Sequence, residues 1–244
     1  GSNIKELVEA AKVIEPKFDI IDINCGCPSW KVIKTGAGSA LLNNPEQIYK
    51  LVSKLVSNTN KPVTIKIRTG IDKNHINAVE VAKKAEDAGA AAVTVHGRTQ
   101  KQRFSGKSDW DIIKKVKQSV SIPVIGNGDV DSPELFKQKL EESEVDAIMM
   151  GRAAIGNPYL FKQINDFMKT GNYDNHNNIS EFLEYVKLAN KYDLKYRSIK
   201  SQAIHFVRYV KDAASIRKQL TACKDLDSLM NIVNQVLNYN NGSK

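Results

Sequence analysis

An interrupted apolar run at residues 21–31 sets the pattern for the rest of the chain: Ile21-Asp22-Ile23-Asn24-Cys25-Gly26-Cys27-Pro28-Ser29-Trp30-Lys31. The run breaks into Asn-Cys-Gly-Cys-Pro, which predicts a strand that stops abruptly in a loop carrying two thiols. Glycine lets the backbone approach a ligand closely, while Pro28 fixes its own φ and biases Cys27 towards an extended conformation. We therefore expect a stiff backbone to hold Cys27 at the carboxyl end of a strand.

The same pattern of a strand followed by a loop recurs along the chain. Further apolar segments lead into polar or glycine-bearing loops at residues 63–68, 92–98, 122–129 and 145–152. Segments with helical spacing lie between them, from Asn44 to Val56, Asn74 to Ala88, Asp109 to Val120 and onward from Ser132. This alternation predicts a parallel sheet covered by helices, with about five strand-helix units whose strands are apolar on both faces.

Two parallel architectures suit this alternation, a doubly wound sheet and a (β/α)8 TIM-type barrel. We prefer the barrel because every strand end, and not one switch point, carries Asn, Lys, Arg or His. The glycines of Gly36-Ala37-Gly38 lack the third glycine of a dinucleotide fingerprint and do not leave a strand directly, which argues against a Rossmann site. A barrel needs eight strands, so we expect roughly three further units upstream of Gly1.

The strand pattern stops beyond Pro158. A polar segment at residues 171–178 precedes helical periodicity without strands, so we predict a catalytic barrel portion over residues 1–170 and a small helical domain over residues 171–244. The middle of this helical domain interleaves basic and aromatic residues, namely Lys191-Tyr192, Lys195-Tyr196-Arg197, Lys200, His205-Phe206, Arg208-Tyr209, Lys211 and Arg217-Lys218. A solvated helix face would explain any one of these charges, whereas their concentration favours binding to a phosphate backbone.

The composition is that of an ordinary globular chain, with 41% hydrophobic and 26% charged residues among 244, which excludes a disordered protein. The formal net charge of +9 fits a polyanionic partner such as nucleic acid, although many basic proteins bind none. No apolar run approaches the roughly 20 residues that span a bilayer, and the first residues have no signal-peptide core. We expect a cytoplasmic monomer without membrane contact.

The cysteines are Cys25, Cys27 and Cys223, an odd number without framework spacing, which predicts free thiols. Cys-x-Cys is a poor spacing for zinc, and we expect no metal. Cys25 suits packing inside the strand end, whereas Cys27, between Gly26 and Pro28, is better placed to point into a cavity. The residues alone leave Cys27 open between a general acid and a structural thiol.

The strand ends carry side chains that can do chemistry, namely Asn24 and Cys27, Lys66 and Arg68, His96 and Arg98, Asn127 and Asp129, and Gly151 and Arg152. In a barrel these ends converge on one face. Lys66 alone would suit a solvent-reaching side chain and His96 a hydrogen-bonded histidine near the core. Burying either cation requires a partner, which an anionic cofactor would supply. The loops Gly126-Asn127-Gly128-Asp129 and Gly151-Arg152 follow the last two strands, where such barrels often bind phosphate through glycine N–H groups.

Together these motifs resemble the tRNA-dihydrouridine synthases, a flavin-dependent family. The stretches that carry the resemblance are Asp22-Ile23-Asn24-Cys25-Gly26-Cys27-Pro28 with Lys31-Val32 and Gly36-Ala37-Gly38, Val63-Thr64-Ile65-Lys66-Ile67-Arg68, His96-Gly97-Arg98-Thr99 with Phe104-Ser105-Gly106 and Asp109-Trp110, Gly126-Asn127-Gly128-Asp129, and Gly151-Arg152-Ala153 with Gly156-Asn157-Pro158. They match closely over about residues 1–165 and more loosely in the helical tail.

The resemblance implies FMN in the barrel mouth, reduced by NADPH, and hydride transfer to carbon 6 of a tRNA uracil while a cysteine protonates carbon 5. Cys27 matches the proton donor and Lys66 the residue that contacts the flavin ring. Contacts to the flavin and its phosphate are implied for His96, Asn127, Gly128, Asp129, Gly151 and Arg152. Contacts to the substrate RNA are implied for Asn24, Lys31, Arg98 and Arg103, and the helical tail would grip the tRNA body.

Two alternatives remain at this point. A related flavin barrel such as a dihydroorotate dehydrogenase also uses Asn and Cys-Pro loops, but it gives no reason for the basic helical tail. The other alternative is a non-catalytic RNA-binding fragment with an incomplete, flavin-free barrel.

Overall fold

The computed structural model describes residues 1–208 and 210–241, so Tyr209 of the basic and aromatic segment lies outside the described residues. The chain divides into two compact units. The first comprises Gly1–Val130 and Leu135–Met150, and the second comprises Asp131–Glu134 and the residues from Gly151 onward. The boundary expected between residues 170 and 171 lies inside the second unit.

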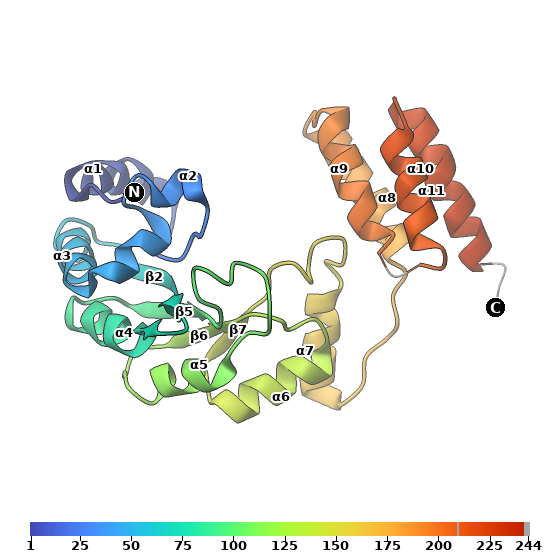
Figure 1. The fold of residues 1–244 in the computed structure, drawn as a ribbon. Coiled ribbons are helices and arrows are strands. Elements are labelled where there is room, and N and C mark those ends of the chain that lie inside the picture. The colour runs from blue at the N-terminus through green and yellow to red at the C-terminus, as the bar shows by residue number, and fades with distance from the viewer. Residues whose placement is uncertain (209, 242–244) are drawn as a thin grey trace. The chain divides into compact units, whose positions relative to one another are not determined.

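The first unit is built on a parallel five-stranded sheet with the strand order β1-β2-β5-β6-β7 (Figure 1). Its strands are β1 (Ile21–Asn24), β2 (Val63–Arg68), β5 (Ala92–His96), β6 (Val124–Asn127) and β7 (Ala147–Met149). The register sets Asn24 beside Lys66, Arg68 beside His96, and His96 beside Asn127. The strand ends that the sequence singled out therefore meet along one edge of the sheet, and the five expected units are confirmed.

The two faces of this sheet differ in polarity. Ile23, Ile65 and Val95 are buried on the face that packs against helices. Side chains alternate along a strand, so Asp22, Thr64 and their neighbours in register point to the opposite face. There Thr64 Oγ1 donates a hydrogen bond of 2.7 Å to Asp22 Oδ1. The expectation of strands apolar on both faces was wrong, because the alternation in residues 63–68 encodes one core face and one polar face.

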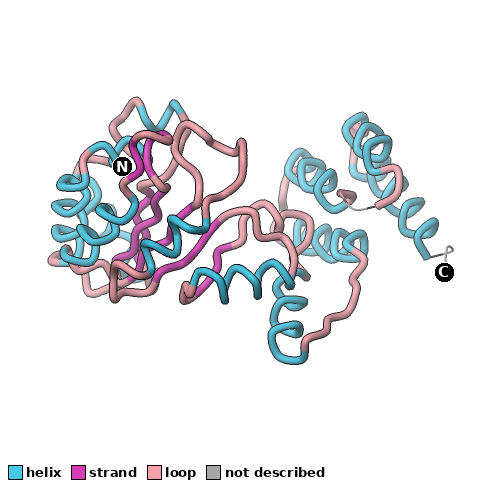
Figure 2. The backbone as a smooth tube through the Cα atoms, turned by 60° about the horizontal axis from the view of Figure 1, so that its bottom comes forward, coloured by secondary structure: helices cyan, strands magenta, loops and turns pink. Residues whose placement is uncertain are grey.

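Helices join the strands and bury the apolar face (Figure 2). They are α1 (Ile4–Ile14), α2 (Trp30–Ile33), α3 (Pro45–Val56), α4 (Ala78–Asp87), α5 (Trp110–Lys117) and α6 (Pro133–Ser143), with the short 3-10 helices η1 (Glu15–Lys17) and η2 (Gly38–Asn43). Side-chain oxygens cap several starts, since Asn3, Asn44 and Asp109 accept from the N–H groups of Glu6, Gln47 and Ile112. The helix starts expected after Asn44 and near Asp109 are confirmed.

A small hairpin occupies residues where the sequence predicted a helix. Strands β3 (Gly70–Asp72) and β4 (His75–Ile76) pair antiparallel, and the Asn74 N–H donates to Asp72 Oδ1 over 3.0 Å. Gly70 has a φ of +158°, and a Cβ there would collide with the backbone of His75. Helix α4 therefore begins at Ala78 and not at Asn74, because the turn captures the polar residues before it.

The second unit is helical. It contains α7 (Leu160–Thr170), α8 (Asn178–Lys191), α9 (Tyr196–Phe206), α10 (Ala213–Ala222) and α11 (Leu226–Asn241). Ile179, Phe182, Leu220 and Leu229 lie in its core, where the Phe182 and Phe206 rings are 5.3 Å apart. The expected helical periodicity is confirmed, although the sequence did not separate α10 from its neighbours. Within the described residues, no helix is long and apolar enough to cross a bilayer.

Candidate active site

Hydrogen bonds fix the backbone of the Cys27 loop on both sides. Asn24 Oδ1 accepts from the N–H groups of Gly26 and Cys27 at 3.0 and 2.9 Å. The Cys27 carbonyl accepts from the Ser39 hydroxyl at 2.8 Å and from the Ser39 N–H at 3.1 Å. The stiff backbone expected for Cys27 is confirmed, and Ser39 is a contributor that the sequence analysis missed.

The glycine pattern at residues 36–38 serves this loop. Gly38 has a φ of +61°, and a Cβ built there would lie 2.8 Å from the Cys27 carbonyl oxygen. Only glycine combines this conformation with so close an approach. These residues pack η2 against the Cys27 loop. This packing role agrees with the argument that the segment is not a Rossmann dinucleotide site.

A cavity of about 250 Å³ opens at the carboxyl edge of the sheet. Its lining residues are Asn24, Gly26, Cys27, Pro28, Lys66, Arg68, His96, Phe104 and Asn127. Cys27 is partly exposed, whereas Cys25 is fully buried and the pKa of its thiol is raised to about 12 by burial and by the charge of Asp22. The structure therefore distinguishes a packed thiol from one that lines the cavity.

Lys66 and Asn127 link three strands at the cavity. Lys66 Nζ donates to Asn127 Oδ1 over 3.0 Å, and Asn127 Nδ2 donates to the Met149 carbonyl over 2.7 Å. Burial, together with the charge of Arg68, lowers the pKa of Lys66 to about 8. An amine in this state can carry a positive charge near neutral pH and can also lose it readily.

His96 lies in the same cavity with one nitrogen unsatisfied. The ring is buried, and its Nδ1 atom has no hydrogen-bond partner in the described part of the chain. Burial lowers the pKa of His96 to about 3, and the nearby cations Arg68 and Lys66 add to this effect. The imidazole is therefore neutral at physiological pH, and its free nitrogen is a group that a polar ligand would complete.

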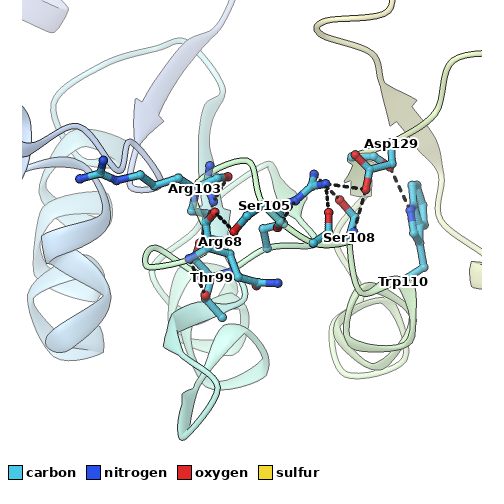
Figure 3. Close-up of polar contacts among 11 residues, drawn as sticks. Arg68, Thr99, Arg103, Ser105, Ser108, Trp110 and Asp129 are labelled. Atoms are coloured by element: carbon cyan, nitrogen blue, oxygen red, sulfur yellow. Dashed lines mark hydrogen bonds and ion pairs between the residues drawn. The ribbon is translucent and has the colours of Figure 1, made fainter.

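Arg68 joins two loops that are distant in sequence (Figure 3). Its Nε donates to the Gly26 carbonyl at 3.0 Å, and its Nη1 donates to the carbonyls of Thr99 and Arg103 at 2.7 and 3.0 Å. The side chain is 4% exposed, and burial together with the charge of Arg98 lowers its pKa to about 10. The sequence marked Arg68 as a strand-end residue but gave it no role.

Arg98 is buried, and its guanidinium donates hydrogen bonds to several protein groups. It donates to the carbonyls of Ser105 and Gly106 and to the Ser108 hydroxyl, and its Nη2 lies 2.8 Å from Asp129 Oδ2. Burial alone would raise the pKa of Asp129, but the Arg98 hydrogen bond and the Ser108 N–H lower it below its ordinary value. Arg98, expected at an RNA-facing surface, instead holds the loop of residues 99–108.

The remaining predicted residues lie in different settings. Lys31 on α2 and Arg103 in the loop are exposed. Gly128 leaves room for the Ser108 side chain, and its carbonyl accepts from Trp110 Nε1 at 3.1 Å, so this glycine has a packing role. Gly151 and Arg152 belong to the second unit. The phosphate contacts expected of Gly128, Gly151 and Arg152 stay predictions.

Two solved structures share the fold of this chain. One is described as TcOYE with pHBA and has a TM-score of 0.52 at 20% identity, covering 67% of this chain and 48% of that one. The other, a morphinone reductase mutant in complex with tetrahydroNAD, has a TM-score of 0.50 at 14% identity, covering 66% of this chain and 48% of that one. The likeness assigns the sheet and its helices to the TIM-barrel type.

Close sequence relatives carry the name tRNA-dihydrouridine synthase B. That of Shewanella oneidensis is 45% identical over 173 residues, covering 70% of this chain and 54% of the relative. That of Klebsiella pneumoniae is 46% identical over 172 residues with the same coverage. The chain thus spans about half the length of the curated relatives it matches. The sequence model of the dihydrouridine synthase (Dus) family matches residues 1–240, and the chain belongs to that family.

Proposed function

We propose that this chain takes part in the reduction of specific tRNA uridines to 5,6-dihydrouridine with FMN and NADPH, with Cys27 as the proton donor. The observation that carries the proposal is the composition of one cavity. Cys27, Lys66 and His96 all line it, and the buried Nδ1 of His96 has no hydrogen-bond partner among the described residues. Reduction of a carbon–carbon double bond needs a hydride source and an acid, and this cavity offers an acid beside groups suited to an anionic cofactor.

The residues of the cavity fit a flavin. FMN, when bound, would supply the hydride, and NADPH would renew it. Lys66, with a pKa of about 8, would place a positive charge beside the reduced flavin, which favours the anionic form. His96 would complete its buried Nδ1 by a hydrogen bond to the cofactor. We assign further flavin and phosphate contacts to Asn127, Gly128, Asp129, Gly151 and Arg152.

Cys27 would deliver a proton to carbon 5 of the uracil. Its backbone is fixed by Asn24 and Ser39, so the thiol is presented from a rigid support. A uracil must leave the base stack to enter a cavity of this kind, and Asn24 would contact the flipped base. The buried Cys25 thiol cannot replace Cys27, because it is fully shielded within the core.

The tRNA partner is supported by charge and by kinship. The formal net charge is +9, and Lys191, Lys195 and Lys218 of the second unit are exposed. Lys31 and Arg103, exposed in the first unit, would add contacts to the RNA backbone. Such contacts position the polyanion, while the cavity selects the base. The relatives are named for the same substrate class.

The test compares two thiols in nearly the same loop. Cys27→Ala should abolish dihydrouridine formation in tRNA while flavin absorbance is retained, whereas Cys25→Ala should retain product formation. Undiminished product from Cys27→Ala would overturn the assignment of the acid. A colourless chain that binds tRNA with steep salt dependence would support the RNA-binding alternative, and turnover of free dihydroorotate without RNA would favour the other flavin barrel.

A further inference from the structure

We propose that Arg68 is a positioning residue that couples the Cys27 loop to the loop of residues 99–106. Its three hydrogen bonds reach the carbonyls of Gly26 on one side and of Thr99 and Arg103 on the other. One guanidinium therefore ties the thiol-bearing loop to the loop whose Phe104 lines the same cavity. The inference rests on the proposed function only in taking that cavity as the place of reaction.

The chemistry of the side chain suits this role. A guanidinium presents several N–H donors in a rigid plane, whereas a lysine amine is a single charged point on a flexible stem. Arg68 is 4% exposed, and its hydrogen bonds in the described part of the chain go to backbone carbonyls. Its charge-assisted hydrogen bonds therefore serve to fix backbone segments and not to pair with a carboxylate.

The loop that Arg68 holds needs an external support. Arg103 has a φ of +50°, a conformation that is costly for a residue with a side chain, and Arg68 binds its carbonyl. The next residue, Phe104, lines the cavity and is 62% exposed. Displacement of the Arg103 carbonyl would therefore move the cavity wall relative to Cys27.

Two other residues hold each loop separately and provide matched comparisons. Ser39 binds the Cys27 carbonyl through its hydroxyl and its N–H. Arg98 binds the carbonyls of Ser105 and Gly106. Through these hydrogen bonds Ser39 supports the Cys27 side and Arg98 supports the 105–106 side. Arg68, which binds carbonyls of both loops, is the residue whose loss should loosen both.

The experiment measures both loops in the same protein. Hydrogen exchange of the amides of residues 99–106 measures how readily that loop opens. The rate of Cys27 alkylation by iodoacetamide, in a Cys25→Ala background, measures how readily the Cys27 loop exposes its thiol. Arg68→Lys should speed both by about tenfold, the size expected for losing hydrogen bonds to a charged group. Ser39→Ala should speed only alkylation, and Arg98→Lys only exchange. A change in neither or in one alone for Arg68→Lys would overturn the proposal.

Two further measurements keep the test decisive. In the unaltered chain, NMR should show the Arg68 Nε–H protected from exchange with water, and rapid exchange of that proton would contradict the role without any variant.

With tRNA and cofactors, Arg68→Lys should lower the single-turnover rate about tenfold and change the KM for tRNA less than twofold. If the unaltered chain forms no dihydrouridine, the proposed function fails, while the exchange and alkylation results still decide the role of Arg68.

Discussion

Lys66 Nζ donates a hydrogen bond to Asn127 Oδ1 over 3.0 Å and so joins β2 to β6 across the intervening β5. The amide group of Asn127 is oriented in turn by the Met149 carbonyl. The acceptor of this buried amine is a neutral amide oxygen and not a carboxylate, which leaves its positive charge available to a ligand. Burial and the charge of Arg68 lower the pKa of this amine to about 8.

Replacing Lys66 should weaken flavin binding. Lys66→Met removes the charge while retaining much of the side-chain length, and we expect FMN affinity to fall by at least about tenfold, since a buried charge-assisted contact is worth more than ~1.4 kcal/mol. Fluorescence titration of FMN measures this change. Lys31→Met, which removes an exposed lysine close to the Cys27 loop in sequence, is the control. Equal affinities for the two variants would contradict the role of Lys66.

The free energy of unfolding should fall as the pH is lowered, and part of this fall should come from His96. Its folded-state pKa of about 3 lies below the ordinary 6.5, so the unfolded chain takes up a proton in this window and the folded chain does not. The contribution of His96 to folding is complete above pH 6.5 and is lost as pH falls towards about 3, by up to a few kcal/mol. Urea unfolding of His96→Gln should show a weaker pH dependence between pH 6.5 and 4 than the unaltered chain. Parallel curves would argue against a buried neutral imidazole.

Removing the partner of Arg98 should destabilise the first unit. Asp129→Asn leaves a guanidinium that is 3% exposed without its carboxylate, and we expect a loss of about 1–3 kcal/mol in the free energy of unfolding. Glu46→Gln breaks the exposed pair of Glu46 with Lys84 and should cost less than about 1 kcal/mol. Urea denaturation of both variants makes the comparison. A loss no larger for Asp129→Asn than for Glu46→Gln would show that the buried pair adds little.

Two glycines of one motif offer a test of the contact behind Cys27. Gly36 and Gly38 both have positive φ, but a Cβ at Gly36 would meet only the Ser2 side chain at 3.5 Å or beyond, whereas one at Gly38 would lie 2.8 Å from the Cys27 carbonyl. Gly36→Ala should therefore cost about 1 kcal/mol of backbone strain, and Gly38→Ala about 1–3 kcal/mol more. Unfolding curves and the Cys27 alkylation rate measure both effects. A Gly36→Ala loss as large as that of Gly38→Ala would contradict the close approach.

Local patterns predicted the elements well where a single strand or helix explains them. Val63–Arg68 is a strand with the expected bounds, and Asn44 caps the helix that begins at Pro45. The hairpin at residues 70–76 was missed because its turn depends on Asp72 accepting from Asn74, a local contact that competes with helix formation.

The sequence predicted which residues line the candidate site, but it did not predict the hydrogen bonds that hold the surrounding loops. Spacing along the chain placed Cys27, Lys66, His96 and Asn127 at strand ends, and these residues line one cavity. The roles of Arg68 and Arg98 depend on carbonyls in loops up to 42 positions away, and no periodicity encodes such contacts. Arg98, for which the family resemblance implied a contact to RNA, is buried.

Alternate positions of β2 serve the core and the candidate site in turn. Ile65 and Ile67 enter the core while Lys66 enters the cavity between them. Loss or gain of a single residue in this strand would exchange the two faces, sending the amine into the core and isoleucine into the cavity. A change in the length of this strand would therefore damage the core and the site in one step, whereas a substitution affects only the face on which the replaced side chain lies.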